Sequence, residues 1–149
     1  MTKIKIKVKI EPGCEDLPLP KYQTEHASGM DLLAAVENKV TLAPGQYALI
    51  SAGIRIELPI GYEAQVRPRS GLALNHGIGV LNSPGTIDAD YRGIVGVILI
   101  NHSQNPFEIR RSDRIAQLVI QPVNQGELEV FLELKETERG LGGFGSTGH

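Results

Sequence analysis

Hydrophobic and polar residues alternate with a period of two along much of this chain. In the first such run, KIKIKVKI at residues 3–10, lysines alternate with aliphatic residues. This alternation predicts a β-strand with one buried face, and the row of lysines suits an exposed or edge position. The run LEVFLEL at residues 128–134 has the same pattern, so it predicts a second half-buried strand.

Three further stretches have the apolar content of strands. The run IVGVILI at residues 94–100 is apolar almost throughout, which predicts a central strand buried on both faces. QYALISAGIRIEL at 46–58 and AQLVIQPV at 116–123 are expected to form further strands. Turn signals containing proline or glycine separate these runs at short intervals. Many short strands with regular turns predict an all-β sandwich or barrel.

Two segments could instead be helical, and the end of the chain has a different character. DLLAAVENK at 31–39 begins with a residue able to cap a helix, and GLALNHG at 71–77 could form one short helix. From residue 139 onward glycine dominates, with no strand or helix pattern. The chain is therefore expected to comprise one domain, residues 1–138, and a flexible arm, residues 139–149.

Composition and charge narrow the class of protein. With 149 residues, 41% of them hydrophobic, the chain is long enough for the core of one globular domain. A net charge of −2 gives no basic field that would attract nucleic acid. The start MTKIKIKVKI lacks the apolar core expected of a signal peptide, and no apolar run is long enough to cross a membrane. A single Cys14 fits a reducing compartment. These features favour a cytoplasmic protein without a disulfide framework, and the scattered histidines give no zinc-binding spacing.

The first stretch with candidate chemistry is VRPRSGLA at residues 66–73. Arg67 and Arg69 carry fork-shaped donors that suit phosphate. The adjacent Ser70 and Gly71 combine a hydroxyl with a backbone that an anion can approach closely. The alternative is a surface turn with two solvated arginines.

Two more polar stretches adjoin predicted strands. In LNSPGTIDADYRGIVG at 81–96, an aspartate before a buried strand could orient and deprotonate a water molecule, or it could simply cap a turn. Spacing does not choose between Asp88 and Asp90. In SDRIAQLVI at 112–120, Arg114 and Gln117 stand where a strand begins, so they could face a site or only solvent.

Taken together and in this order, five stretches resemble the signature motifs of the trimeric deoxyuridine triphosphatases, the dUTPases. The matching stretches are ASGMDLLA at 27–34, RPRSGLA at 67–73, GTIDADYRG at 85–93, RIAQL at 114–118 and RGLGGFGSTG at 139–148. The departures are small: Thr86 stands where the family commonly has an aliphatic residue, and Met30 lies inside the first motif. Neither is a position on which the chemistry depends, although Thr86 is counted with the substrate-binding residues of its motif.

The resemblance implies a fold and an assembly. It implies an all-β subunit, a distorted β-barrel or jelly roll with one short helix and a flexible C-terminal arm. It moves DLLAA from helix to strand, against its local propensity. It also implies a homotrimer with active sites at the subunit interfaces, in which the segment after Gly126 packs on another subunit.

The resemblance further implies hydrolysis of dUTP to dUMP and pyrophosphate, which keeps uracil out of DNA and supplies dUMP for dTMP synthesis. Asp88, rather than Asp90, matches the aspartate that activates water for in-line attack on the α-phosphorus. Asp31 matches a residue that acts on Mg²⁺ through water. The phosphate-binding positions match Arg69, Ser70, Gly71 and Gln117.

The remaining implied contacts are with the nucleoside and with the arm. Asn82, in a hairpin over 79–91, is expected to help pair with the uracil edge, and Tyr91 to lie against the deoxyribose and exclude a 2′-OH. In the arm, Phe144 is expected to stack on uracil. The expected arm residues at the phosphates are Arg139, Gly145, Ser146 and Thr147.

Two other functions fit a fold of this kind. One is a non-enzymatic β-barrel that binds nucleotides, against which the intact Asp88 argues. The other is a deaminase, or a bifunctional deaminase–hydrolase, acting on dCTP; release of ammonia from dCTP distinguishes it.

Overall fold

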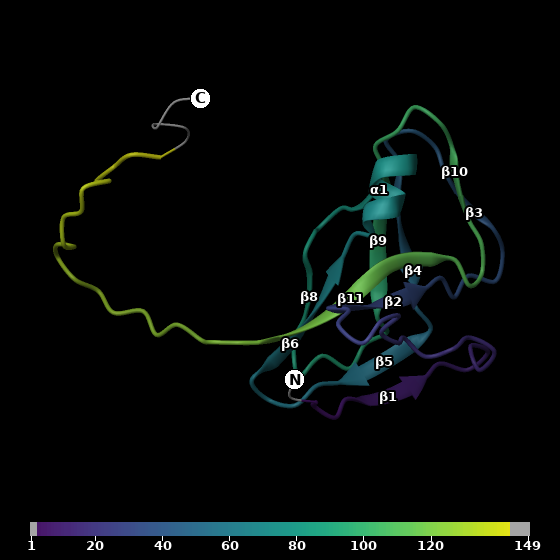
Figure 1. Ribbon diagram of the computed structural model, residues 1–149, viewed down its shortest axis with the longest axis horizontal. Helices are drawn as coiled ribbons and strands as arrows, with labels where there is room; N and C mark the ends of the chain where they lie inside the picture. Colours follow the sequence, from purple (N-terminus) through teal and green to yellow (C-terminus); the bar gives the residue numbers. More distant parts are fainter. Residues whose placement is uncertain (1–2, 144–149) are drawn as a thin grey trace.

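The structure is a computed structural model that describes residues 3–143. The arm residues Phe144, Gly145, Ser146 and Thr147 therefore lie outside the described residues. Within the described part, the chain forms eleven strands and one short helix (Figure 1). The elements are β1 (Lys7–Ile10), β2 (Gly29–Leu33), β3 (Val40–Leu42), β4 (Tyr47–Ser51), β5 (Ile54–Glu57), β6 (Tyr62–Arg67), α1 (Ser70–His76), β7 (Ile78–Val80), β8 (Gly85–Ile87), β9 (Gly96–Asn101), β10 (Phe107–Ile109) and β11 (Arg114–Pro122).

The strands pair in four small antiparallel sheets. The largest has the order β2-β11-β6-β8, and the second has the order β4-β9-β7. Two-stranded sheets, β1-β5 and β3-β10, complete the body. Across the described residues none of these sheets closes on itself, so the expected all-β fold with one short helix is confirmed as an open, jelly-roll-like arrangement rather than a closed barrel.

The core lies where the two larger sheets turn their apolar faces inward. Leu32, Val66 and Leu118 come from the largest sheet, and Val97 and Leu99 come from the second; all are at most 3% exposed. Strand residues at alternate positions point to opposite faces, so the same strands present their polar residues outward. One outward face of the largest sheet carries the candidate site described below.

The two ambiguous segments resolve as the family resemblance implied. DLLAA lies largely in β2, because pairing with β11 and the full burial of Leu32 outweigh local helix propensity. GLALNHG forms most of α1, which ends at Gly77 with a left-handed φ of 64° and a hydrogen bond from its N–H to the Ala73 carbonyl. No helix of the described residues has the length and apolarity needed to span a membrane.

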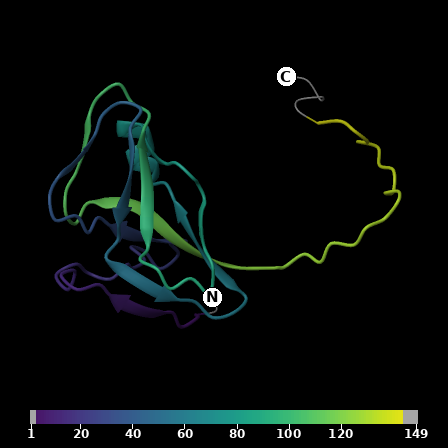
Figure 2. The same cartoon turned by 180° about the vertical axis from the view of Figure 1, so that it is seen from behind.

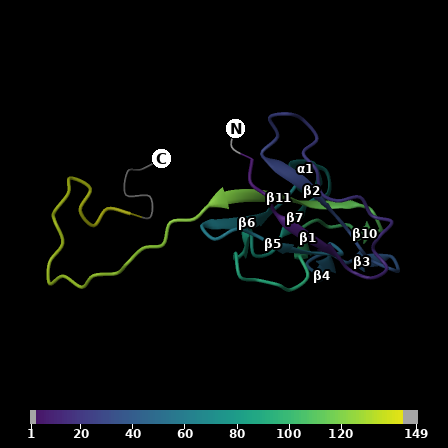
Figure 3. The ribbon, with the colours of Figure 1, turned by 90° about the horizontal axis from the view of Figure 1, so that it is seen from below.

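Three strand predictions were wrong in part. The run at residues 3–10 forms a strand only over Lys7–Ile10, and all four residues of that strand are exposed. Strand β9 alternates between buried and partly exposed residues, so within this chain one of its faces is covered rather than both. Residues 128–134 form no strand in the described chain, because no strand of the same chain lies beside them. After β11 the chain runs outward and curves away from the body, as all three ribbon views show (Figures 1, 2 and 3).

Candidate active site

The largest sheet brings three predicted stretches together across its neighbouring strands β2, β11 and β6. Gln117 on β11 lies opposite Asp31 on β2 and, on its other side, opposite Arg67 on β6. Strand β6 ends at Arg67, and after Pro68 and Arg69 the helix α1 begins. The register of three strands therefore sets the first, second and fourth motifs side by side.

Asp31 is held between two arginines. The Arg69 Nε donates to Asp31 Oδ1 at 3.0 Å, and the Arg114 Nη1 donates to Asp31 Oδ2 at 3.5 Å. Arg69 also donates through Nη1 to the Arg114 carbonyl oxygen at 3.1 Å. The Asp31 side chain is 15% exposed, so these contacts compensate its charge where little water reaches it. Sequence reasoning left Arg114 open between a site and solvent, and the structure places it against Asp31.

Gln117 is oriented by a hydrogen bond to the backbone and by the space that Gly29, which has no side chain, leaves beside it. Its Nε2 donates to the Pro68 carbonyl oxygen at 2.9 Å. A Cβ on Gly29 would lie 2.5 Å from the Gln117 Oε1. The glycine of the first motif therefore makes room for the Gln117 amide, a role that sequence reasoning missed. Asp31, Arg69, Arg114 and Gln117 are called the Asp31 cluster below.

Ser70 and Gly71 lie next to the Asp31 cluster at the beginning of α1. Both residues are exposed, and nothing lies within 4 Å of the position of a Cβ on Gly71. The Ser70 hydroxyl and the adjoining backbone are therefore accessible to a ligand. The predicted group of Arg69, Ser70, Gly71 and Gln117 does come together in one place.

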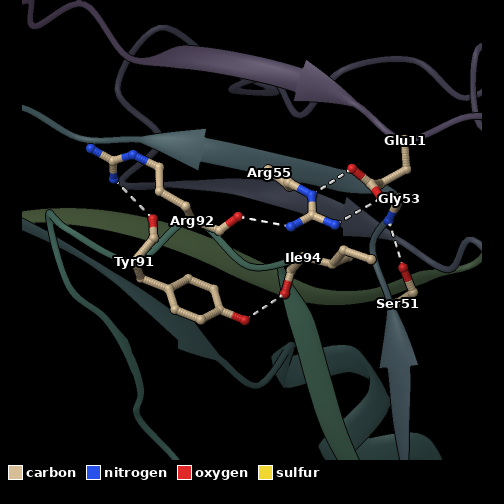
Figure 4. A network of polar contacts seen from close by, with 7 residues as sticks. All are labelled: Glu11, Ser51, Gly53, Arg55, Tyr91, Arg92 and Ile94. Atoms are coloured by element: carbon tan, nitrogen blue, oxygen red, sulfur yellow. Dashed lines mark hydrogen bonds and ion pairs between the residues drawn. The ribbon is translucent and has the colours of Figure 1, made fainter.

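The third motif begins in β8 and continues into a separate loop, residues 88–94. Asp88 is exposed, and its carbonyl oxygen accepts a hydrogen bond from the Tyr91 N–H at 3.2 Å. The Tyr91 hydroxyl donates to the Ile94 carbonyl oxygen at 3.1 Å, which fixes the ring (Figure 4). A Cβ on Gly93 would lie 2.1 Å from that hydroxyl oxygen, so only glycine lets the ring lie there.

Asn82 and Thr86 lie earlier in the same hairpin. The Asn82 amide nitrogen is 3.3 Å from the position that a Cβ on Gly85 would take, so the Asn82 side chain covers the Gly85 backbone. Thr86 is exposed on β8, opposite Gln65 of β6. Asp90, the alternative to Asp88, is exposed as well.

Asp88 and the Asp31 cluster lie toward opposite ends of β6. Strand β8 runs antiparallel to β6, pairing Gly85 with Val66 and Ile87 with Ala64, so Asp88 follows toward the beginning of β6. Ser70 instead follows the end of β6. At about 3.3 Å per strand residue, the two steps from Ala64 to Val66 alone separate them by roughly 7 Å. One chain therefore does not bring Asp88 to the phosphate-binding group.

Arg139 contacts neither group within the chain. Its Nε donates to the Gly142 carbonyl oxygen at 2.8 Å, within the C-terminal segment that leaves the body after β11 (Figure 1).

The acidic residues of the described part offer no complete metal cage. No group of three or more histidine, cysteine, aspartate or glutamate side chains is gathered there that could hold an ion. Asp31 is a single carboxylate, and arginines already contact both of its oxygens. This donor set fits a cation held mainly by phosphate oxygens, with Asp31 reaching it through water.

A family model of the dUTPases matches residues 15–148, most of the chain. The chain belongs to the dUTPase family. The enzyme class expected from the sequence, a dUTP diphosphatase, is thereby confirmed. Mg²⁺ is the expected cofactor, and a mutant of the dUTPase from phage phi11 of S. aureus coordinates a structural Mg(II) ion.

Solved dUTPases have the same fold. The dUTPase of Staphylococcus bacteriophage 80alpha, solved with dUPNHPP, is 26% identical in sequence to the present chain. The two structures superpose with a TM-score of 0.86, and the match covers 99% of this chain and 100% of that chain. The dUTPase from phage phi11 of S. aureus is 22% identical, with a TM-score of 0.78 over 90% of this chain and 100% of that one.

Proposed function

We propose that this member of the dUTPase family hydrolyses dUTP to dUMP and pyrophosphate at sites that neighbouring copies of the chain complete. The observation that carries the proposal is the Asp31 cluster beside the exposed Ser70 and Gly71. Arginine forks, an amide, a hydroxyl and accessible backbone meet there, and together they suit a chain of phosphates. The binding of dUPNHPP by the phage 80alpha dUTPase supports this choice of ligand.

Positioning and charge compensation supply most of the catalysis. Arg69, Ser70, Gly71 and Gln117 hold the phosphates, so that the α-phosphorus faces the attacking water. Asp31 would hold Mg²⁺ through water, and the ion would supply positive charge that offsets part of the negative charge of the phosphates. The two arginines on Asp31 keep that carboxylate in place before the substrate arrives.

Asp88 acts as the general base. Its carboxylate accepts a proton from a water molecule while the water oxygen forms a bond to the α-phosphorus. The bond from the α-phosphorus to the bridging oxygen breaks, and pyrophosphate leaves with that bonding pair. The product dUMP is then available for dTMP synthesis, and uracil is kept out of DNA.

Specificity comes from the hairpin and the loop. Asn82 and the hairpin backbone pair with the uracil edge, so cytosine leaves buried polar groups without partners. Thr86 lies on the same hairpin, and a tight fit excludes the thymine methyl group. The Tyr91 ring, held by its hydrogen bond to Ile94, lies against the deoxyribose and leaves no room for a 2′-OH.

A homotrimer explains the two separated groups. The Asp31 cluster of one copy meets the Asp88 loop of a second copy, which removes the separation along β6. The apolar row of residues 128–134 packs on a neighbour, since within its own chain it lies exposed. The glycine-rich arm, residues 139–149, closes over the nucleotide. Its closing contacts come from Arg139, Phe144, Gly145, Ser146 and Thr147.

The first experiment compares pyrophosphate release from dUTP, dCTP, dTTP and UTP in the presence of Mg²⁺. We expect release from dUTP alone, and we expect Asp88→Asn to bind dUTP while turnover falls by roughly 100- to 10,000-fold, the range of general-base catalysis. Release from none of the four nucleotides would contradict the proposal. Ammonia from dCTP would identify a deaminase instead.

A second experiment tests the shared site. Asp88→Asn and Ser70→Ala are each expected to be inactive as pure proteins. When the two are co-expressed, mixed trimers contain sites with an intact Asp88 from one copy and an intact Ser70 from another, so activity should return. No recovery in demonstrably mixed trimers would place both residues in one chain's site.

A further inference from the structure

We propose that the ion pair between Glu11 and Arg55 positions the loop of residues 88–94 and thereby helps set the discrimination between dUTP and UTP. The inference rests on the proposed function, in which Asp88 and Tyr91 of this loop act on the substrate. Glu11 and Arg55 lie outside all five motifs, 44 residues apart, so local sequence gives no signal for the contact.

Arg55 uses its three nitrogens on two different partners. Its Nε donates to Glu11 Oε1 at 2.6 Å and its Nη2 to Glu11 Oε2 at 3.2 Å, while its Nη1 donates to the Arg92 carbonyl oxygen at 2.9 Å (Figure 4). Glu11 directly follows β1, and its N–H donates to the Gly53 carbonyl oxygen. The carboxylate is thus held by the backbone beside β5, and it fixes the plane of the guanidinium that reaches the loop.

The contact continues into the loop through Arg92. The Arg92 Nη1 donates to the carbonyl oxygens of Ala89 at 2.7 Å and Tyr91 at 3.0 Å. These bonds, with that of the Tyr91 hydroxyl to Ile94, tie the loop together internally. In the described residues, the Arg55 side chain makes the one hydrogen bond to residues 88–94 that comes from outside the loop.

The ion pair persists at neutral pH. The hydrogen-bonded Arg55 guanidinium lowers the pKa of the Glu11 carboxyl below its ordinary value, so the carboxylate stays ionised. The Glu11 side chain is 17% exposed and that of Arg55 is 37% exposed, so water competes only partly for these bonds.

Loss of the carboxylate is expected to move the loop without dismantling it. In Glu11→Gln the guanidinium loses its charged partner, while the contacts inside the loop and the Asp31 cluster remain. The Tyr91 ring then fits the 2′ position less closely. We expect the ratio of kcat/KM for dUTP to that for UTP to fall by roughly tenfold, less than the roughly 100-fold cost of a 1 Å misplacement of reacting groups.

A matched pair elsewhere in the chain provides the control. Arg111 likewise binds both oxygens of Asp16, at 3.0 and 2.6 Å, and also donates to the carbonyl oxygens of Gly13 and Val36. It makes no contact with the loop. Asp16→Asn should therefore leave the dUTP-to-UTP ratio unchanged. Arg55→Lys retains the charge but not the three-donor fork, and it should lower the ratio as Glu11→Gln does.

Hydrogen exchange gives a readout that does not depend on activity. The amides of residues 88–94 should exchange faster in Glu11→Gln than in Asp16→Asn. If the unaltered enzyme is selective for dUTP, and Glu11→Gln keeps both its ratio and its slow loop exchange, the inference is overturned and the proposed function stands. If the unaltered protein does not hydrolyse dUTP, the proposed function fails and the role in discrimination fails with it.

Discussion

In the Asp31 cluster each charged side chain contacts another residue of the same chain, whereas the apolar side chains of the C-terminal segment, residues 123–143, lie in solvent. Asp31 is bonded to Arg69 and Arg114, and Gln117 is bonded to the backbone between β6 and α1. In the C-terminal segment, Leu128 is 96% exposed and Leu132 is 103% exposed. The first region is complete within one chain, and the second is not.

The two regions differ in which chain supplies the contacts of their side chains. A monomer rarely leaves a row of large apolar side chains in water, because burial stabilises by about 25 cal/mol per Å² of apolar surface. The alternation in residues 128–134 is that of a half-buried strand, yet the described chain supplies nothing to cover it. The segment is therefore suited to a neighbouring copy, while the cluster is suited to its own chain.

The largest expected effect comes from two truncations that divide the C-terminal segment. Deleting residues 127–149 should abolish both trimer formation and turnover, because it removes the apolar row. Deleting only residues 139–149 should leave the trimer intact and lower turnover by roughly 100-fold, since the phosphates are then positioned less well. Light scattering and pyrophosphate release measure the two properties separately. Unchanged turnover after the shorter deletion would refute closure by the arm.

The next largest effect should come from Arg69→Lys. Arg69 bridges the Asp31 carboxylate and the Arg114 carbonyl oxygen, and a lysine ammonium lacks the planar fork for that geometry. We expect turnover to fall by about 10- to 100-fold, as for the loss of a charge-assisted contact worth ~1.5–3 kcal/mol. The exposed Arg110, which pairs with Glu108, gives the control Arg110→Lys, with turnover unchanged. Equal losses in the two variants would remove the special role of the cluster.

The same two regions show where sequence reasoning reaches its limit. The alternation predicted strands in most of the body correctly, because strand residues at alternate positions bury one face. It also marked residues 128–134 as a strand, but alternation does not say which chain supplies the partner. Alternation is a property of the segment itself, whereas the strand that pairs with it can belong to another chain.

The cluster was predicted as a set of residues but not as a geometry. The family motifs identified Asp31, Arg69 and Gln117, whereas their contacts depend on the register of β2, β11 and β6, which local patterns do not encode. The roles of Arg114 and Gly29 followed only from that register. The separation of Asp88 from Ser70 along β6 likewise became visible only in the paired sheet.

A smaller effect is expected from Gly29→Ala. The added methyl group would lie 2.5 Å from the Gln117 Oε1, and the long Gln117 side chain can swing aside at little cost in stability. Its hydrogen bond to Pro68 is then lost, so turnover should fall by about fivefold, equivalent to one hydrogen bond of ~1 kcal/mol. If the effect acts through Gln117, adding Gly29→Ala to Gln117→Ala should change turnover no further. An additive loss would mean that Gly29 acts on something else.

The smallest effect on turnover should come from Asp16→Asn. Asp16 pairs with Arg111 of the same chain, away from both the Asp31 cluster and the C-terminal segment. The hydrogen-bonded Arg111 lowers the pKa of Asp16 below 3.8, so the pair stabilises the fold above that pH and the contribution is lost as the pH falls through the lowered pKa. The variant should therefore have a lower Tm than the unaltered protein at about pH 7, and the difference should narrow on acidification below about pH 3.8. Thermal unfolding across this range tests the sign, and turnover at about pH 7 should be unchanged. A loss of turnover as large as that of Gly29→Ala would show that contacts remote from the cluster also govern its geometry, and the contrast between the self-contained Asp31 cluster and the partner-dependent C-terminal segment would weaken.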